Sequence, residues 1–199
     1  MAKLIFFDRD HTYQVDGENI PSVSEVIRFM SREIYDGITQ FTLDNAADRG
    51  TRVHKACENI DRFGSCEITA DIEPYVRAYI QFRRDLEPDW QRIECAAYHE
   101  ALRYAGTIDR YGTIGGKRMV VDLKTNSQIK TPLVTAQLNG YRLMAQANGM
   151  EVDGIAVLQL MKDGRYRYKE MEADDSTFLA CLTLHEALKK KSRKRTDEK

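Results

Sequence analysis

A glycine pair, Gly115-Gly116, separates two segments that both have the residue pattern of β-strands, AGTIDRYGT before it and KRMVVDLKT after it. A two-residue turn at the glycines would join these segments into an antiparallel hairpin. Paired residue numbers then sum to 231, which places Asp109 directly opposite Asp122. Opposed side chains on one face of such a pair have Cβ atoms about 4.5–5.5 Å apart. The turn therefore predicts two carboxylates side by side on one face of a sheet.

The second of these segments contains VVDLKT, in which two charged residues interrupt an apolar strand pattern. Because strand side chains alternate faces, Asp122 and Lys124 point one way, and Val121 and Leu123 point the other. Buried opposite charges can form a structural ion pair, although such pairs seldom improve stability. Two opposed carboxylates repel each other, and a divalent cation with a preference for oxygen ligands, Mg²⁺ or Mn²⁺, would remove that repulsion. We interpret the strand as one wall of a metal site, with a purely structural salt bridge of Lys124 as the alternative.

The remaining pattern predicts an α/β protein with a mixed central β-sheet flanked by helices. Further strands are expected over residues 90–100, in a hairpin turning at Asp16-Gly17 and in a hairpin turning at Asp163-Gly164. Ser22, with Glu25 three residues later, has the capping-box pattern of a helix start. The expected helices cover residues 22–30, 44–63, 73–87, 131–148 and 174–191.

The composition is that of a soluble globular protein. Of the 199 residues, 42% are hydrophobic and 31% charged, and no stretch approaches the roughly 20 apolar residues of a membrane span. We expect one domain over residues 1–188, a basic and disordered tail over residues 189–199, and no membrane contact. The start of the chain lacks the pattern of a secretory signal, so a cytoplasmic location is expected. A net charge of −1 neither indicates nor excludes a nucleic-acid partner.

Several short motifs, taken in order, resemble a known nuclease family. The GTID of residues 106–109 and the DLKT of residues 122–125 resemble the core of the PD-(D/E)XK nuclease superfamily, which has a restriction-endonuclease-like fold. RGTRVH (49–54), IECAAYHEALRYAGTID (93–109) and the Q-x-x-x-Y spacing within AQLNGYRLM (136–144) resemble its RecB-like branch. The segment HTYQVDGENIPSVSEVI (11–27) is similar to the start of phage-type members. Together these motifs cover most of residues 11–145.

The resemblance implies a Mg²⁺- or Mn²⁺-dependent deoxyribonuclease with a defined set of site residues. It makes His54, Asp109 and Asp122 metal ligands and adds the carbonyl oxygen of Leu123. Lys124 would orient or deprotonate the attacking water, or stabilise the charge that develops on the phosphate oxygens. Without the resemblance, His54 would be interpreted as an ordinary half-buried histidine.

Five more residues are expected to support the site. Gln137 and Tyr141 lie four apart and share a helix face, so they would contact the DNA backbone or lie beside the catalytic lysine. The alternative is a core tyrosine beside a solvated glutamine. Glu100 would flank the site. Arg49 and Arg52, which flank Gly50 ahead of His54, could hold phosphates, although exposed arginines usually have no such role.

The resemblance also implies partners and a cellular setting. The expected partners are DNA, a single-strand annealing recombinase and further copies of the chain as a homo-oligomer, in the cytoplasm of a bacterial host cell. Some RecB-like nucleases hold an iron–sulfur cluster with four cysteines, three of them near the C-terminus. Here Cys57, Cys66 and Cys95 lie early and Cys181 alone lies late, so no cluster is expected.

The expected function is hydrolysis of DNA phosphodiester bonds by a phage or prophage exonuclease in recombination or repair. One alternative is a structure-specific or nicking endonuclease that uses the same site. A second is a catalytically silent DNA-binding module, and a protein adaptor without any DNA affinity is the third.

Overall fold

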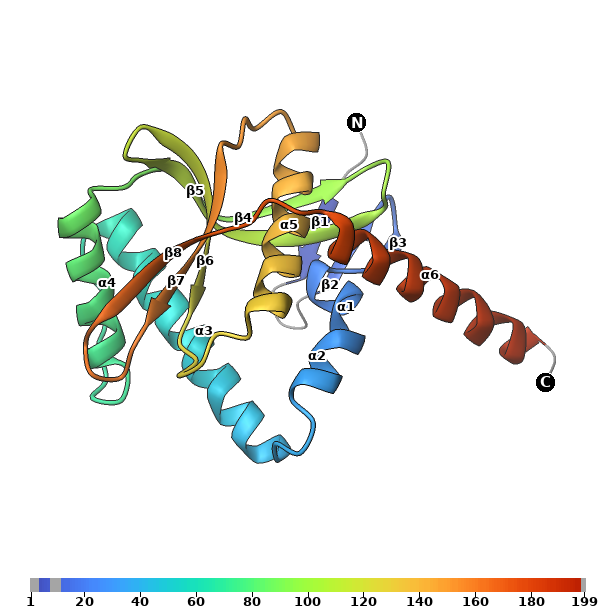
Figure 1. Ribbon diagram of the computed structural model, residues 1–199, viewed down its shortest axis with the longest axis horizontal. Helices are drawn as coiled ribbons and strands as arrows, with labels where there is room; N and C mark the ends of the chain where they lie inside the picture. Colours follow the sequence, from blue (N-terminus) through green and yellow to red (C-terminus); the bar gives the residue numbers. More distant parts are fainter. Residues whose placement is uncertain (1–3, 8–11, 198–199) are drawn as a thin grey trace.

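The computed structural model describes residues 4–7 and 12–197, with side chains described as far as residue 189. A five-stranded sheet in the order β4-β5-β6-β7-β8 lies at its centre (Figure 1). Strands β6 and β7 run parallel, and the other neighbours in this sheet run antiparallel. The predicted mixed sheet is confirmed. Its strands are β4 (Asp89–His99), β5 (Tyr104–Ile114), β6 (Lys117–Lys124), β7 (Gly154–Leu160) and β8 (Tyr166–Met171).

The hairpin between β5 and β6 has the predicted turn and register. Gly115 and Gly116 have φ values of 57° and 80°, a left-handed conformation that glycine adopts without steric cost. Pairing runs from Ile114–Lys117 to Arg110–Val121, so the paired numbers sum to 231 as expected. Asp109 and Asp122 follow one position beyond the last of these pairs.

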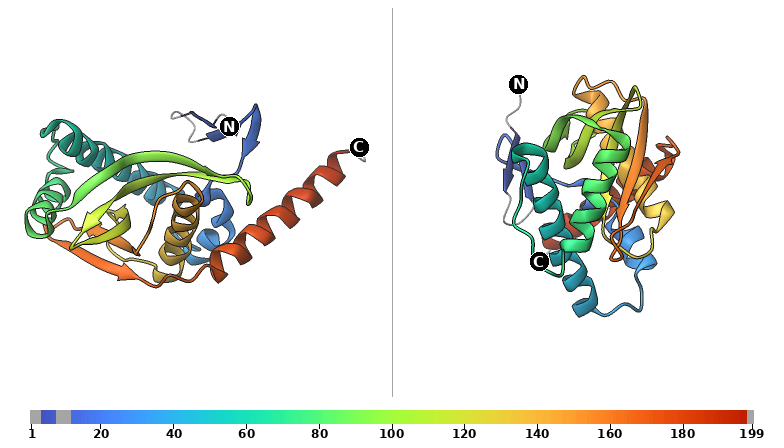
Figure 2. Two further views of the ribbon diagram at one scale, coloured as in Figure 1. Left: turned by 90° about the horizontal axis from the view of Figure 1, so that it is seen from above. Right: turned by 90° about the vertical axis from the view of Figure 1, so that its left-hand side faces the viewer.

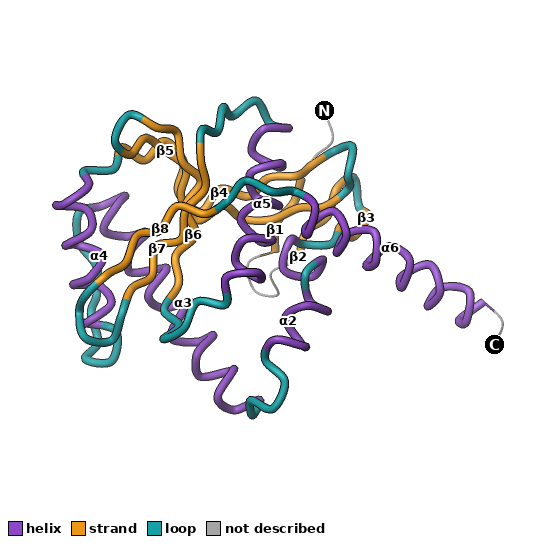
Figure 3. The backbone as a smooth tube through the Cα atoms, viewed as in Figure 1, coloured by secondary structure: helices purple, strands orange, loops and turns teal. Residues whose placement is uncertain are grey.

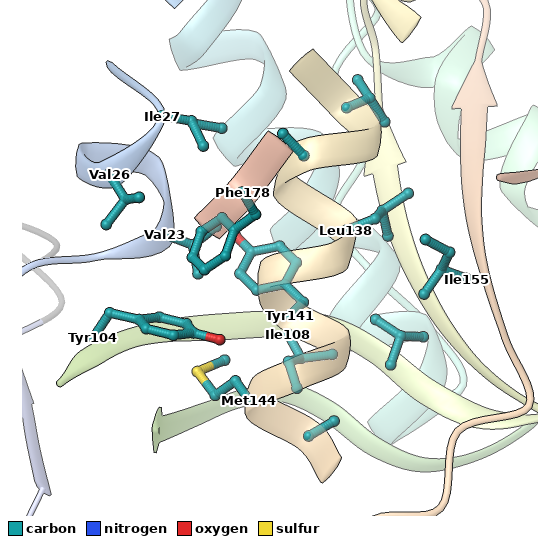
Figure 4. Packing of buried hydrophobic residues seen from close by; sticks show 14 of the residues in the cluster. Val23, Val26, Ile27, Tyr104, Ile108, Leu138, Tyr141, Met144, Ile155 and Phe178 are labelled. Atoms are coloured by element: carbon teal, nitrogen blue, oxygen red, sulfur yellow. The ribbon is translucent and has the colours of Figure 1, made fainter. Parts of the chain in front are cut away.

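Helices cover both faces of the sheet (Figures 1 and 3). Helices α3 (Gln40–Phe63) and α4 (Glu73–Leu86) pack on the face that carries Val121 and Leu123. Helix α5 (Thr131–Ala147) packs on the face that carries Val120 and Ile155. Because β6 and β7 are covered on both sides, their central residues are apolar apart from Asp122 in β6 and Gln159 in β7. Figure 4 shows the packing of α5 residues such as Leu138 and Tyr141 in this second core.

A separate three-stranded sheet lies at the N-terminal end. It consists of β1 (Leu4–Phe7), β2 (Thr12–Val15) and β3 (Glu18–Ile20), and the expected Asp16-Gly17 turn joins β2 to β3. Residues 8–11, which include the start of the motif 11–27, lie outside the described residues.

The first helical segment is divided into two short helices. Helices α1 (Val23–Val26) and α2 (Arg28–Ile34) meet at Ile27, where a single helix was expected. The capping box of Ser22 and Glu25 is present: the Glu25 amide donates to Ser22 Oγ, and the Ser22 amide donates to Glu25 Oε2. The sequence therefore predicted the start of this segment better than its continuation.

The last helix differs from the expectation of a disordered tail. Helix α6 (Ser176–Asp197) continues through residues 189–197, and its distal part extends away from the rest of the molecule (Figure 2). Lysine and arginine are good helix formers, and no glycine or proline interrupts this segment. The charge run therefore continues the helix instead of ending it. No helix among the described residues is long and apolar enough to cross a membrane.

Candidate active site

The C-terminal end of β6 opens into a hollow of about 1020 Å³. Helix α3 contributes Gly50 and His54 to its lining, β4 contributes Glu94, and β6 contributes Leu123 and Lys124. Gly50 faces Thr125 at close range, since a Cβ built on it would lie 3.8 Å from Thr125 Oγ1. The predicted motif residues 49–54 and 122–125 therefore meet at one place in the fold.

Three carboxylates form a row across three neighbouring strands. In the β4–β5 register Ile93 pairs with Arg110 and Cys95 with Ile108, so Glu94 lies opposite Asp109. The β5–β6 register in turn brings Asp122 opposite Asp109. Asp109 is 7% exposed and Asp122 is 2% exposed. The negative charges of such a row repel one another, which lowers the stability of the fold unless a positive charge lies between them.

His54 approaches this row from α3. Its Nδ1 atom lies 3.6 Å from Asp109 Oδ2 and 3.7 Å from Glu94 Oε1. Its Nε2–H donates to the carbonyl oxygen of Leu123 at 3.0 Å, so that oxygen, which was expected to bind the metal, is hydrogen-bonded to the histidine. Burial lowers the pKa of His54, but Asp109 and Glu94 outweigh it and raise the pKa to about 9. The position of Nδ1 is therefore one where positive charge is stabilised.

Lys124 lies at the other end of the row. Its Nζ atom is 3.0 Å from Asp122 Oδ1 and 2.7 Å from Asp122 Oδ2. It also donates to Gln137 Oε1 at 3.0 Å, and Gln137 Nε2 donates to the hydroxyl of Tyr141 at 3.1 Å. Burial lowers the pKa of Lys124, whereas Asp122 and Asp109 raise it, and the net effect is a raised pKa with a charged ammonium. The structure thus brings Gln137 and Tyr141 beside the lysine, while Tyr141 also packs in the core (Figure 4).

The donor set of this site suits a hard divalent cation. One ligand atom from each of His54, Glu94 and Asp109 lies within 4.8 Å of the others, and Asp122 adjoins them. Burial raises the pKa of both aspartates. The charge of Glu94 raises the pKa of Asp109 further, and the charge of Asp109 raises that of Asp122, while His54 and Lys124 act in the opposite direction on both. Among the described residues, Asp122 Oδ2 accepts no hydrogen bond of good geometry, although Lys124 lies close to it. Carboxylate oxygens with one imidazole nitrogen fit Mg²⁺ or Mn²⁺.

Glu94 was not among the residues predicted for the site. It lies in the middle of β4 with a φ of 47°, in a strand whose pairing also shifts register between Trp90 and Arg92. The strand was expected to continue through Glu100. A prediction that residues 100–103 form a four-residue turn would have fixed the β4–β5 register and placed Glu94 opposite Asp109. Left-handed backbone at a non-glycine residue is strained, and such strain is found where a side chain has a functional position.

Three predicted residues are not brought to the site. Glu100 lies in the exposed turn after β4, at the far end of the strand from the hollow. The guanidinium of Arg49 lies 5.6 Å from the ring centroid of Tyr75. Arg52 forms surface ion pairs at 3.0 Å with Asp48 and 2.6 Å with Asp71. None of the three lines the hollow.

A buried arginine supports the carboxylate row from the α3 and α4 side. Arg110 is fully buried, and its Nη1 donates to Glu94 Oε1 at 3.0 Å and to the carbonyl oxygen of Asp109 at 2.7 Å. Its Nε donates to Asp61 Oδ2 at 2.7 Å. The guanidinium therefore holds the β4 and β5 members of the row in place.

We expect Arg110→Met to lower the free energy of unfolding by about 3–5 kcal/mol, because it removes the buried cation that Asp61 and Glu94 share and leaves Asp61 with only Arg83 and the Tyr79 hydroxyl among the described residues. Urea unfolding followed by circular dichroism measures this change. Arg103→Met is the matched control, because its ion pair with Glu18 is exposed and such pairs contribute about 1 kcal/mol or less. Equal losses in both variants would contradict a structural role for Arg110.

We expect Glu94→Gln to weaken Mn²⁺ binding about 10–100-fold, the range found when groups that support a metal site are removed. The substitution keeps the size of the side chain and its acceptor toward Arg110 while removing one negative charge. Isothermal titration with Mn²⁺ measures the affinity. Glu100→Gln, which removes the same charge in the exposed turn, should bind Mn²⁺ like wild type; a matching loss there would exclude a local role for Glu94.

Among the solved structures similar to this chain are two of one exonuclease and one further protein. The chain is similar to the alkaline exonuclease LHK-Exo from Laribacter hongkongensis, with 19% identity over 82% of this chain and 92% of that one and a TM-score of 0.37. The same exonuclease in complex with dAMP has 16% identity, coverage of 88% and 94%, and a TM-score of 0.41. A third structure, SSO0001, has 15% identity, coverage of 88% and 79%, and a TM-score of 0.45. No protein-family model and no curated protein matches the chain.

Proposed function

We propose that this chain is a nuclease that hydrolyses DNA phosphodiester bonds with the help of Mg²⁺ or Mn²⁺. One observation carries the proposal: the row of Glu94, Asp109 and Asp122 lies between His54 and Lys124 beside a large hollow. A structural sheet has no use for three adjacent buried or half-buried carboxylates. A bound cation and a separate fixed positive charge both stabilise the charge that develops when a phosphodiester is hydrolysed; the carboxylates and His54 would hold the first, and Lys124 would supply the second.

The carboxylates and the histidine would hold the cation. Asp109 and Asp122 would be its main ligands, with His54 Nδ1 and Glu94 completing the set. Asp109 Oδ2 already accepts the amide of Leu123 at 2.7 Å, which fixes its carboxylate in one orientation. When bound, the cation supplies Lewis-acid polarisation of the phosphate and a lowered pKa for water.

Lys124 would act on the phosphate and on the attacking water. Its raised pKa favours a charged ammonium, which suits hydrogen-bond donation to the water and stabilisation of negative charge on the phosphate oxygens. The acceptor Gln137 Oε1 holds this ammonium at 3.0 Å, and Tyr141 in turn holds Gln137. Gln137 and Tyr141 are therefore positioning residues in this proposal.

The motifs extend the proposal to a biological role. Their order and spacing favour the RecB-like branch of the PD-(D/E)XK superfamily, and within it a phage or prophage exonuclease of recombination or repair. Such an enzyme would work in the cytoplasm of a bacterial host, as a homo-oligomer or beside a single-strand annealing recombinase. An endonuclease with the same site, or a silent DNA-binding module, are the competing functions.

Digestion of two DNA substrates tests the proposal. Linear DNA labelled at one end and covalently closed circular DNA are incubated with the protein and Mg²⁺. Degradation of the linear substrate alone is expected, because an exonuclease requires an end. Cleavage of the circle would replace the exonuclease by an endonuclease, and binding without cleavage of either substrate would leave the silent module.

A further inference from the structure

Three cationic side chains surround a second hollow, which lies beside the active site. Its volume is about 380 Å³, and its lining includes Lys130, Arg167 and Lys169. Arg167 and Lys169 are exposed residues of β8, which pair with Gln159 and Val157 of β7. Lys130 directly precedes the first turn of α5.

These cations lack the ion pairs that neighbouring cations form. Lys117 pairs with Glu170 at 3.2 Å, and Arg165 at the start of the same hairpin pairs with Asp163 at 2.5 Å. Among the described residues, no carboxylate lies within ion-pair distance of Lys130, Arg167 or Lys169. Unpaired cations around a concave surface attract an anion and raise its local concentration.

The rest of the lining supplies hydrogen-bond donors and one oxygen that accepts no hydrogen bond from the described residues. The first amides of α5 have no side-chain cap, and the N-terminus of a helix favours anions. Gln159 is 2% exposed, and its Nε2 donates to the carbonyl oxygens of Asn126 at 2.7 Å and Ser127 at 3.1 Å. Its Oε1 accepts no hydrogen bond from the described residues. A ligand with both an anionic group and N–H donors, as in a nucleotide, matches this combination.

A third, smaller hollow lies between the second hollow and the active site and shares lining residues with both. The catalytic hollow shares Tyr35, Lys124 and Asn126 with a hollow of about 220 Å³. That smaller hollow shares Gln128, Ile129 and Lys130 with the cationic one. The three hollows therefore follow one another around the loop that joins β6 to α5. The amide of Gln159 fixes this loop through its two hydrogen bonds.

We propose that Lys130, Arg167 and Lys169 bind a backbone phosphate of the DNA strand whose scissile phosphate lies at the carboxylate row. This inference rests on the proposed function, because it uses the same strand as the ligand. It adds a second contact point, away from the reacting phosphate, that would hold the strand in register during hydrolysis.

Binding of a fluorescein-labelled single-stranded oligonucleotide tests this subsite. A length of roughly 20 nucleotides exceeds the usual site size of one binding groove. Fluorescence anisotropy is measured in EDTA over a series of salt concentrations, so that affinity is measured separately from cleavage. The test variant is Arg167→Gln with Lys169→Gln. The matched control is Lys162→Gln with Arg165→Gln, which removes the same charge from the same hairpin outside the hollow.

We expect the test variant to bind about tenfold more weakly than wild type. The slope of log K against log salt should fall by about 0.7 for each lost phosphate contact. The control should retain both the affinity and the slope. Equal behaviour of the two double variants would overturn the inference, since net charge alone would then explain any change.

The same experiment separates this inference from the proposed function. If wild type binds the oligonucleotide through Arg167 and Lys169 but cleaves no DNA, the nuclease proposal fails and the subsite stands. If wild type cleaves DNA and the test variant binds DNA as the control variant does, the subsite inference is wrong and the nuclease proposal is unaffected. Absence of any binding by wild type at low salt would overturn both.

Discussion

Asp122→Asn is expected to abolish DNA cleavage, with a loss of about 10³-fold or more, and to weaken divalent cation binding while the fold is retained. Asp122 is 2% exposed and lies opposite Asp109 in the β5–β6 register, where the proposed cation would bind. The amide has the same shape as the carboxylate but neither its charge nor its second anionic oxygen. Loss of that charge also removes the ion partner of Lys124, whose Nζ lies 2.7 Å away.

Single-turnover cleavage of an end-labelled duplex and calorimetric titration with Mn²⁺ measure the two effects. Circular dichroism and thermal unfolding establish that the variant is folded. Asp36→Asn, in an exposed turn after α2, is the matched control and should cleave like wild type. Cleavage by Asp122→Asn within tenfold of wild type would remove this aspartate from the catalytic centre.

Lys124→Ala should lower the rate of cleavage by about 10²–10⁴-fold, with little change in the affinity for metal or DNA. The lysine is not a ligand in this account: it contacts Asp122 and Gln137 and stabilises charge that appears in the transition state. Loss of such an interaction lowers turnover without an equal loss of binding. Its effect should therefore differ in kind from that of Asp122→Asn.

Single-turnover rates at saturating enzyme, measured beside DNA affinity at fixed salt, distinguish the two kinds of effect. Lys162→Ala removes the same group from the β7–β8 turn and should leave the rate unchanged. If Lys124→Ala cleaves within threefold of wild type, the segment VVDLKT is a structural strand with a salt bridge, and the nuclease assignment fails with it.

The relative positions of Asp109, Asp122 and Lys124 were predictable from sequence, because one hairpin turn and the alternation of strand side chains determine them. The two-residue glycine turn fixes the β5–β6 register, and that register places Asp109 opposite Asp122. Strand alternation then places Val121 and Leu123 in the core under α3 and α4, and Lys124 toward α5. These relations all lie within the hairpin of residues 109–124 and do not depend on distant segments.

The residues that the sequence did not place depend on an unrecognised turn or on distant packing. Glu94 enters the row through the β4–β5 register, which the four-residue turn over residues 100–103 determines, and that turn contains no glycine or proline. Arg49 and Arg52 share a helix with His54, but their side chains contact Tyr75 of α4 and Asp71 in the turn before α4. Neither effect has a signal in the local residue pattern.

Helix α6 continues into the segment that was expected to be a disordered tail. A run of charged residues was interpreted as disordered because it has no apolar face to bury. Helix propensity and the absence of glycine or proline are sufficient to extend the helix to Asp197 once Phe178 and Leu182 fix its first turns in the core.

Cleavage of end-labelled linear DNA by chelator-treated protein, before and after Mg²⁺ or Mn²⁺ is added, tests the central claim most directly. The claim is that the row of Glu94, Asp109 and Asp122, with His54, holds a divalent cation without which the phosphodiester bond is not hydrolysed. We predict no cleavage by the metal-stripped protein and full recovery when either ion is restored. Undiminished cleavage in EDTA, after trace metal has been removed, would contradict the account.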